Sequence, residues 1–287
     1  MDAVEALSRE VSAGEEAQII KEVETYGYSC VKGYLTASTV RALLARVKEG
    51  YERINRGAKM RYAGVPSRDK DDKILYSVYN LDRMFLDILV TRTVRAIAMN
   101  KLNDVHYRFL PPEVPNYILL YYNARSSGAK LDLHIDSHIP FSGSRTIMMQ
   151  FVCLLEDADE ANGCTVVVPG SHRSAEYTDR GLDKVYPLAG KAGDLICWDS
   201  RLWHGTCANA SNRLRWALIA TLGMWWIKPS MDIVRSVSEE IYRGCSNEQK
   251  QLLGFCSISP ASPLERVNTK CGYEFLRPSI KDYGFPQ

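Results

Sequence analysis

Two histidines and one aspartate have the residue types and the spacing of a metal-binding set. In the segment LDLHIDSHIP, His134 and Asp136 are two residues apart, so in an extended strand both side chains would point to the same face. His204, in GDLICWDSRLWHGTCANAS, follows a strand-like segment and a short turn, and would supply a second imidazole from a different strand. Two imidazoles and one carboxylate bind Fe(II) on one side and leave positions open for a co-substrate and O2. We therefore predict that His134, Asp136 and His204 are iron ligands.

The other three histidines fit this role less well. His138 has the same strand parity as His134, but at about 3.3 Å per residue the two would stand about 13 Å apart, too far to share an ion with Asp136. His172 lies in VVVPGSHRS, where the Pro-Gly-Ser turn favours a turn-stabilising role. His106 begins a strand-like segment, and we expect it to be structural.

An arginine follows His204 by eleven residues, at the start of the apolar segment within NRLRWALIATLG. This residue, Arg215, needs an anionic partner if the segment is a buried strand, because an unpaired buried charge is costly. A guanidinium binds a carboxylate through two parallel hydrogen bonds, and the far carboxylate of 2-oxoglutarate would be a suitable partner. Arg213 has the same strand parity and remains an alternative, and either arginine could instead form a salt bridge at the strand edge.

Together these motifs resemble the phytanoyl-CoA dioxygenase family of Fe(II)- and 2-oxoglutarate-dependent oxygenases over nearly the full chain. The matching segments are HID at 134–136, LEDADEANGCTVVVPGSH at 155–172, GDLICWDSRLWHGT at 193–206, and Arg215. The resemblance implies a double-stranded β-helix, or jelly roll, with flanking helices. It implies Fe(II), 2-oxoglutarate and O2 as cofactor and co-substrates, with ascorbate as a stimulant. It also implies that Thr206, two residues after His204, contacts the co-substrate.

The resemblance also bears on the reaction. Some halogenating members of the family have Gly or Ala where this chain has Asp136, so hydroxylation or another C–H oxidation of a small molecule is expected, giving succinate and CO2. We expect a natural product or an amino-acid-derived metabolite as substrate. An acyl-CoA hydroxylase is the alternative, and the ending GFPQ lacks the peroxisomal S-K-L that would support it. Two other classes stay open: a non-catalytic metal-binding jelly roll that recognises a ligand, and a zinc hydrolase, for which no general base can be named.

The secondary-structure elements expected to position these residues are mostly helices in the first hundred residues and short strands after Val105. Helical periodicity marks Glu15 to Thr25, which closes at Gly27, the segment from Thr36 to near Gly57, and Leu81 to Met99. The polar segment Gly57 to Lys73 is either a lid over a pocket or a mobile surface loop. From Val105 short strand-like segments follow, typical of an antiparallel sandwich or barrel: Tyr117 to Tyr122, Thr146 to Leu155, Thr165 to Val168, Leu195 to Trp198 and Arg215 to Trp226.

Helical texture returns in Val237 to Arg243 and in Asn247 to Phe255. We predict one mainly β domain, with a helical flank at 1–104, a jelly-roll core at 105–227, and a helical cap and tail at 228–287.

The amino-acid composition limits the kinds of partner that we expect for this protein. The 36 basic residues nearly balance the 34 acidic ones, and a net charge of +2 gives no field strong enough for nucleic acid or an anionic membrane. The eight cysteines include no C-x-x-C pair and are expected to be reduced thiols. The amino terminus lacks the order of a signal peptide, and the longest apolar segment, Ala217 to Ile227, is too short to span a bilayer. We expect a cytoplasmic protein with a small-molecule partner, and the sequence leaves its oligomeric state open.

Overall fold

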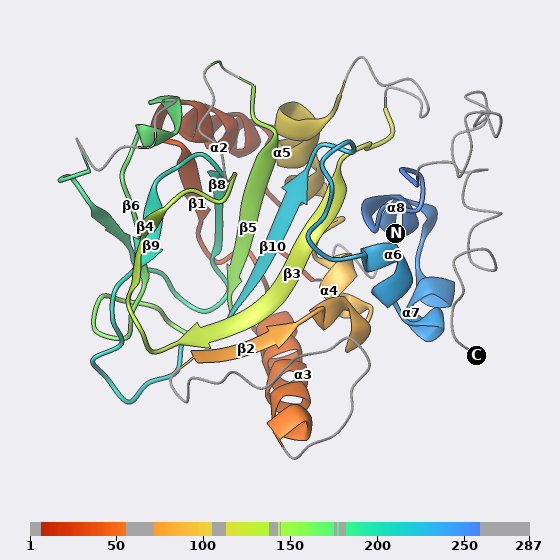
Figure 1. Ribbon diagram of the computed structural model, residues 1–287, viewed down its shortest axis with the longest axis horizontal. Coiled ribbons are helices and arrows are strands. Elements are labelled where there is room, and N and C mark those ends of the chain that lie inside the picture. The colour runs from red at the N-terminus through yellow and green to blue at the C-terminus, as the bar shows by residue number, and fades with distance from the viewer. Residues whose placement is uncertain are drawn as a thin grey trace.

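Two antiparallel sheets face each other in the computed structural model, which describes residues 7–55, 72–104, 113–137, 143, 145–174, 177 and 182–258 (Figure 1). The six-stranded sheet has the order β1 (Tyr28–Val31), β8 (Leu195–Asp199), β5 (Met148–Leu154), β10 (Ala217–Gly223), β3 (Ile118–Ser127) and β2 (Asp72–Tyr76). The four-stranded sheet has the order β4 (Leu131–His134), β9 (His204–Thr206), β6 (Thr165–Val167) and β7 (Tyr186–Leu188). Apart from β2 with β3 and β6 with β7, neighbouring strands are not consecutive along the chain, and this arrangement is the predicted jelly roll.

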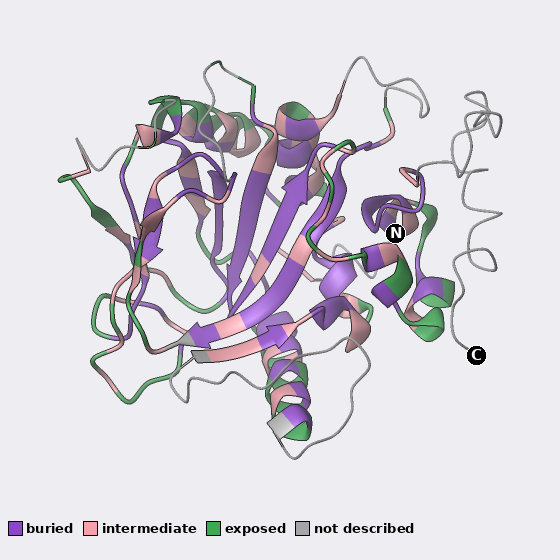
Figure 2. Ribbon diagram, viewed as in Figure 1, coloured by how far each residue is buried: buried purple, intermediate pink, exposed green. Residues whose placement is uncertain are grey.

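The central strands of the large sheet are buried on both faces, and their residues alternate between two environments. On β5, Phe151 and Cys153 belong to the main hydrophobic core under the helices. Val152 and Leu154, on the opposite face, pack in a second cluster that includes residues of the small sheet. Figure 2 shows β5 and β10 buried over most of their length. The large sheet therefore separates a helix-covered core from the space between the two sheets.

Helices cover the face of the large sheet that points away from the small one. They include α2 (Ala13–Tyr26), which contacts β1 and β8, and α5 (Arg92–Leu102), which contacts β5 and β10. α3 (Ala37–Asn55) packs near β2, and three short helices follow the last strand: α6 (Ile233–Ser236), α7 (Glu239–Gly244) and α8 (Asn247–Leu252). Within the described residues, no helix has the length and apolar character needed to cross a membrane.

Several predicted elements are confirmed. α2 ends at Gly27, whose φ of 87° is the left-handed conformation in which glycine commonly closes a helix. α3 matches the helix predicted from Thr36, and the five predicted strands correspond to β3, β5, β6, β8 and β10. The two helices expected after Val237 correspond to α7 and α8.

The prediction of one helix from Leu81 to Met99 is wrong. The structure has α4 (Met84–Asp87) and α5, with a break before Thr91. Thr91 is extended, with ψ at 152°, and its hydroxyl donates to the carbonyl of Ile88 at 3.0 Å and also contacts the Tyr34 hydroxyl. Threonine can compete with the helix for a backbone acceptor in this way, so helical periodicity alone did not reveal the break.

The region at 1–104 also does more than flank the core. It supplies two strands of the large sheet, β1 and β2. β2 begins at Asp72, the next-to-last residue of the predicted lid or loop, and positions 57–71 of that segment lie outside the described residues.

Candidate metal centre

The structure brings His134, Asp136 and His204 together at one end of the space between the sheets. One ligand atom from each side chain lies within 4.8 Å of the others, and this is the one such group of histidine, cysteine and acidic residues in the described part of the chain. His134 is the last residue of β4 and pairs directly with His204, the first residue of β9. The two imidazole centroids are 4.3 Å apart. Antiparallel pairing therefore places two residues opposite each other that are far apart in sequence.

The spacing had suggested that Asp136 lies on the same strand as His134, but the structure places it outside that strand. β4 ends at His134, and Asp136 is in a turn whose backbone N–H donates to the carbonyl of Ser200 at 2.9 Å. The N–H of Ser137 donates to the same carbonyl at 3.0 Å. The turn is thus tied to the segment that follows β8, and it still directs the carboxylate toward both imidazoles.

Both histidines are held in one orientation by the same local contact. Nδ1 of His134 lies 2.9 Å from the carbonyl of Asp132, and Nδ1 of His204 lies 3.0 Å from the carbonyl of Leu202. A carbonyl only accepts, so each Nδ1 carries a proton and each Nε2 is the ring nitrogen that faces Asp136. The Nε2 atoms lie 3.5 Å and 3.3 Å from the two oxygens of Asp136. Ring nitrogens set in this way are the usual state of metal-binding histidines.

The charges at this site are strongly coupled. Burial alone would raise the pKa of the Asp136 carboxyl, but the imidazoles of His204 and His134 outweigh this effect and hold its pKa far below the usual range. Hydrogen bonding to Asp136 raises the pKa of His134. Asp136 is consequently an ionised carboxylate, the form that binds a metal ion.

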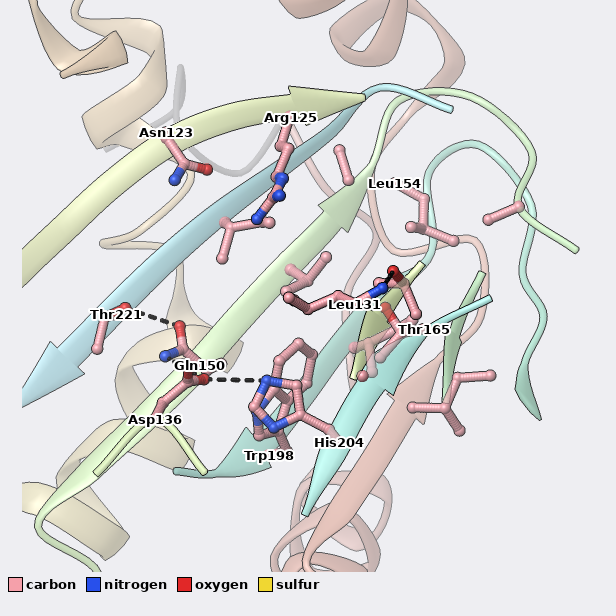
Figure 3. A pocket seen from close by; sticks show the side chains of 18 of the residues that line it. Asn123, Arg125, Leu131, Asp136, Gln150, Leu154, Thr165, Trp198, His204 and Thr221 are labelled. Carbon is pink, nitrogen blue, oxygen red and sulfur yellow. Dashed lines mark hydrogen bonds and ion pairs between the residues drawn. The ribbon is translucent and has the colours of Figure 1, made fainter. Parts of the chain in front are cut away.

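A cavity of about 250 Å³ opens beside the three residues, between the two sheets (Figure 3). Its walls come from β3, β5 and β10 of the large sheet and from β4, β6 and β9 of the small one. Trp198 on β8 packs against His204, with ring centroids 5.1 Å apart. Tyr76 and Tyr121 lie edge to face at 6.0 Å on the β2 and β3 side, where burial raises the pKa of Tyr121 to about 12.

Arg215 and Thr206 line the same cavity. Arg215 is 8% exposed and lies two residues before β10. A Cβ added at Gly163 would lie 3.0 Å from its Nε and 2.8 Å from the carbonyl oxygen of Cys207, so the close approach of Arg215 to the backbone at Gly163 requires a glycine there. Gly163 also has a φ of 89°. Thr206 lies two residues beyond His204 on β9, and its hydroxyl accepts a hydrogen bond from the N–H of Leu131 at 3.1 Å.

The other candidate residues within the described part of the chain, Arg213 and His172, do not line this cavity. Arg213 is an exposed residue whose guanidinium binds the carboxylate of Asp159 at 2.7 Å and 2.8 Å. His172 is buried, and its Nε2 lies 3.2 Å from the carbonyl of Glu24 at the end of α2, which confirms a structural role. His106 and His138 lie outside the described residues.

Several polar residues of the cavity wall were not predicted as site residues. They include Asn123 and Arg125 on β3, Gln150 on β5, Thr165 on β6 and Thr221 on β10. The Gln150 amide donates to Asp136 Oδ2 at 2.8 Å. The available signal was a single polar side chain inside the apolar segment MMQFVCL, because a buried amide needs partners.

A model of the phytanoyl-CoA dioxygenase (PhyH) family matches residues 23–217. An uncharacterised protein of Mycobacterium tuberculosis is 33% identical over 97 residues, which cover 33% of this chain and only 36% of that relative's length. The dioxygenase af480 of Aspergillus fumigatus is 22% identical over 250 residues, 85% of this chain and 78% of its own.

Among solved structures, HygX from Streptomyces hygroscopicus with nickel, 2-oxoglutarate and hygromycin B bound has a TM-score of 0.57. The match covers 74% of this chain and 88% of that chain, at 13% sequence identity. This likeness shows that the two chains share a fold.

Proposed function

The chain belongs to the phytanoyl-CoA dioxygenase family, and from this premise we propose that it is an Fe(II)- and 2-oxoglutarate-dependent dioxygenase that oxidises a C–H bond of a small molecule. The observation that carries the proposal is one cavity lined both by the His134, Asp136 and His204 set and by Arg215. A metal store would need the first of these features but not the second.

The donor set fits iron. Two imidazole Nε2 atoms and one ionised carboxylate converge beside the cavity, and a donor set of this kind would leave further positions on a bound Fe(II) open for a co-substrate. When bound, Fe(II) with 2-oxoglutarate and O2 supplies C–H oxidation, with 2-oxoglutarate converted to succinate and CO2. The protein contributes the orientation of the ligands, through the Asp132, Leu202 and Ser200 carbonyls.

The far end of the cavity fits the second carboxylate of 2-oxoglutarate. Thr206 is two residues from His204 along β9, which corresponds to about 7 Å of strand. Arg215 Nε lies close to Gly163, two residues before β6, and Arg215 lines the cavity together with Thr206. A guanidinium and a hydroxyl that line the same cavity as the metal-binding residues would bind the distal carboxylate of a five-carbon dicarboxylate, and its keto-acid end would be left for the metal.

The substrate is proposed to be a natural product or an amino-acid-derived metabolite. The HygX structure, which contains hygromycin B, supports this substrate class. Asp136 occupies the position that halogenating relatives leave without a carboxylate, which favours hydroxylation or another C–H oxidation over halogenation. The side chains of Tyr76 and Tyr121 would form part of the wall facing this substrate.

Conversion of 2-oxoglutarate to succinate in the presence of Fe(II), ascorbate and O2 tests the proposal. The wild-type protein should release succinate, and candidate metabolites should be screened for those that stimulate the release. Asp136→Ala and His204→Ala should lose this turnover, whereas His172→Gln, a change at a buried histidine outside the cavity, should retain it at temperatures where the variant is folded. Normal turnover in Asp136→Ala would refute the assignment. Anaerobic calorimetry that showed Fe(II) binding without 2-oxoglutarate binding would instead favour a non-catalytic protein.

A further inference from the structure

A chain of two hydrogen bonds joins the large sheet to the carboxylate of Asp136. Thr221 Oγ1 donates to Gln150 Oε1 at 2.8 Å (Figure 3), and Gln150 Nε2 donates to Asp136 Oδ2 at 2.8 Å. Gln150 and Thr221 are direct partners in the pairing of β5 with β10. Both are buried, at 3% and 5% exposure, on the face of the sheet that lines the cavity.

The donors and acceptors on the three side chains fix the direction of both hydrogen bonds. An ionised carboxylate only accepts hydrogen bonds, so the Gln150 side chain must present its NH2 group to Asp136. The amide oxygen then faces Thr221, and the threonine hydroxyl must donate to it. Each member therefore determines the orientation of the next, and a reversed amide would place two acceptors against each other at Asp136.

We propose that Gln150 and Thr221 are positioning residues that orient Asp136 as a metal ligand. Gln150 engages Oδ2 of the carboxylate, which leaves Oδ1, the oxygen nearer His134, to bind the metal. One oxygen bound to the metal and the other held by the amide would keep Asp136 from chelating the ion with both oxygens. This inference rests on the proposed iron site, and it adds a function for two residues that do not touch the metal.

The other explanation is that the two side chains merely satisfy each other in the core. The two explanations differ in what they predict for metal affinity. Partners that hold a metal ligand typically change metal affinity by about 10- to 100-fold when they are lost. A pair that only satisfies core polarity would change the stability of the protein and leave affinity unaltered in the folded molecule.

The experiment is anaerobic calorimetry of Fe(II) binding to the full-length protein and four variants. Gln150→Met keeps the shape and removes the donor, and we expect the Kd for Fe(II) to rise about 10- to 100-fold. Thr221→Val, which is isosteric, should raise the Kd by a smaller factor, because the Gln150 amide loses its bond to Thr221 but can still donate to Asp136. Thr221→Ser keeps the hydroxyl and should remain within twofold of wild type. The double variant Gln150→Met/Thr221→Val should bind no more weakly than Gln150→Met, since Thr221 acts through Gln150.

A second measurement reports the ligand geometry directly. The visible absorption of the Co(II)-loaded protein should change in Gln150→Met and Thr221→Val and stay unchanged in Thr221→Ser. Binding within twofold of wild type in Gln150→Met, or a Thr221→Ser variant as weak as Thr221→Val, would overturn the positioning role. The wild-type protein could bind Fe(II), and the variants could bind it more weakly, while 2-oxoglutarate is never turned over. In that case the positioning role of Gln150 and Thr221 stands and the proposed activity fails.

Discussion

Arg215 and Arg213 show how neighbouring residues of one type differ in what the fold does with them. Both have the strand parity of β10, yet Arg213 is exposed and paired with Asp159, whereas Arg215 is buried in the cavity wall. Periodicity could not separate them, because parity says which face a side chain takes and not where the strand begins. The eleven-residue spacing from His204 was the better guide.

This difference leads to a prediction at Arg215. Each charge-assisted hydrogen bond lost to the 2-oxoglutarate carboxylate costs about 1.5 kcal/mol, so Arg215→Lys should raise the KM for 2-oxoglutarate roughly tenfold and Arg215→Gln roughly a hundredfold. Succinate release at varied 2-oxoglutarate concentration measures both. Arg213→Gln is the matched control and should leave this KM unchanged. An effect at Arg213 equal to that at Arg215 would show that the co-substrate is bound elsewhere.

The individual metal-binding side chains were readable from the sequence, but their supports were not. HID at 134–136 and His204 carry a recognisable pattern, whereas Gln150 and Thr221 are common residue types in strands that pair across the sheet. Their connection to Asp136 depends on the register of β5 with β10 and on the turn after β4. Neither feature has a local signature, because strand register is decided by contacts between distant segments.

At the scale of elements, the pairing of β4 with β9 sets the distance between the two imidazoles. Gly205 lies inside this pair, and a Cβ added there would stand 2.4 Å from the carbonyl oxygen of Leu131. No side chain could fit without separating the two strands. Backbone atoms cannot move aside as the end of a flexible side chain can, so the strain would pass to His134 and His204.

Gly205→Ala should therefore lower both stability and metal affinity. Overpacking of this kind costs about 1–3 kcal/mol, and we expect a lower Tm together with weaker Fe(II) binding in calorimetry. Gly14→Ala is the control, because the nearest atom to an added Cβ there is Ser12 Oγ at 4.0 Å on the helix α2. An unchanged Fe(II) affinity in a folded Gly205→Ala protein would show that β4 can shift without moving its histidine.

The junction of α2 with the short helix η2 (Ser171–Arg173) contains a histidine with a pH-dependent contribution to stability. Burial lowers the pKa of His172, against the opposing effects of Asp199 and the Glu24 carbonyl and with the assistance of Arg201 and Arg173. Its Nδ1 is buried and has no hydrogen-bond partner among the described residues, so the neutral ring with its proton on Nε2 is the form that fits.

The sign of the effect follows from this preference. The unfolded chain takes up a proton near its ordinary pKa of about 6.5 and the folded chain only at lower pH, so the free energy of unfolding should fall as the pH drops below about 6.5. Urea unfolding between about pH 5 and pH 8 measures it. The His172→Gln variant should lack this component, so the stability difference between wild type and variant should shrink toward acid. A difference that is constant over this range would contradict the prediction.

At the scale of the whole molecule, the sequence indicated the jelly roll but not its full extent. The short strand-like segments after Val105 predicted most strands of the two sheets. β1 and β2 were not predicted, because they lie among helices and are only four and five residues long. Their place in the large sheet depends on pairing with β8 and β3, which come much later in the chain. Short edge strands of this kind have little periodicity of their own.

The two sheets also contribute different parts of the site, which predicts how ligands affect stability. The metal ligands belong to the small sheet and its following turn, and Arg215 precedes a strand of the large one. Mn(II) with 2-oxoglutarate, both near 100 times their Kd, should stabilise the fold by about 2.7 kcal/mol for each ligand and raise Tm by several degrees. Arg215→Gln should keep the Mn(II) shift and lose the 2-oxoglutarate shift. Retention of both shifts in that variant would place the co-substrate away from the large sheet.

The placement of Ile74, Tyr76 and Tyr121 at the β2 and β3 end of the cavity has an evolutionary consequence. These side chains line the same cavity as His134, Asp136 and His204 but belong to other strands. Under the proposed function, mutations at the three positions would reshape the substrate side of the cavity while the metal-binding side stays intact. A gene duplicate could thus acquire a new substrate in single steps without passing through an inactive enzyme, and libraries for directed evolution would be best confined to these positions.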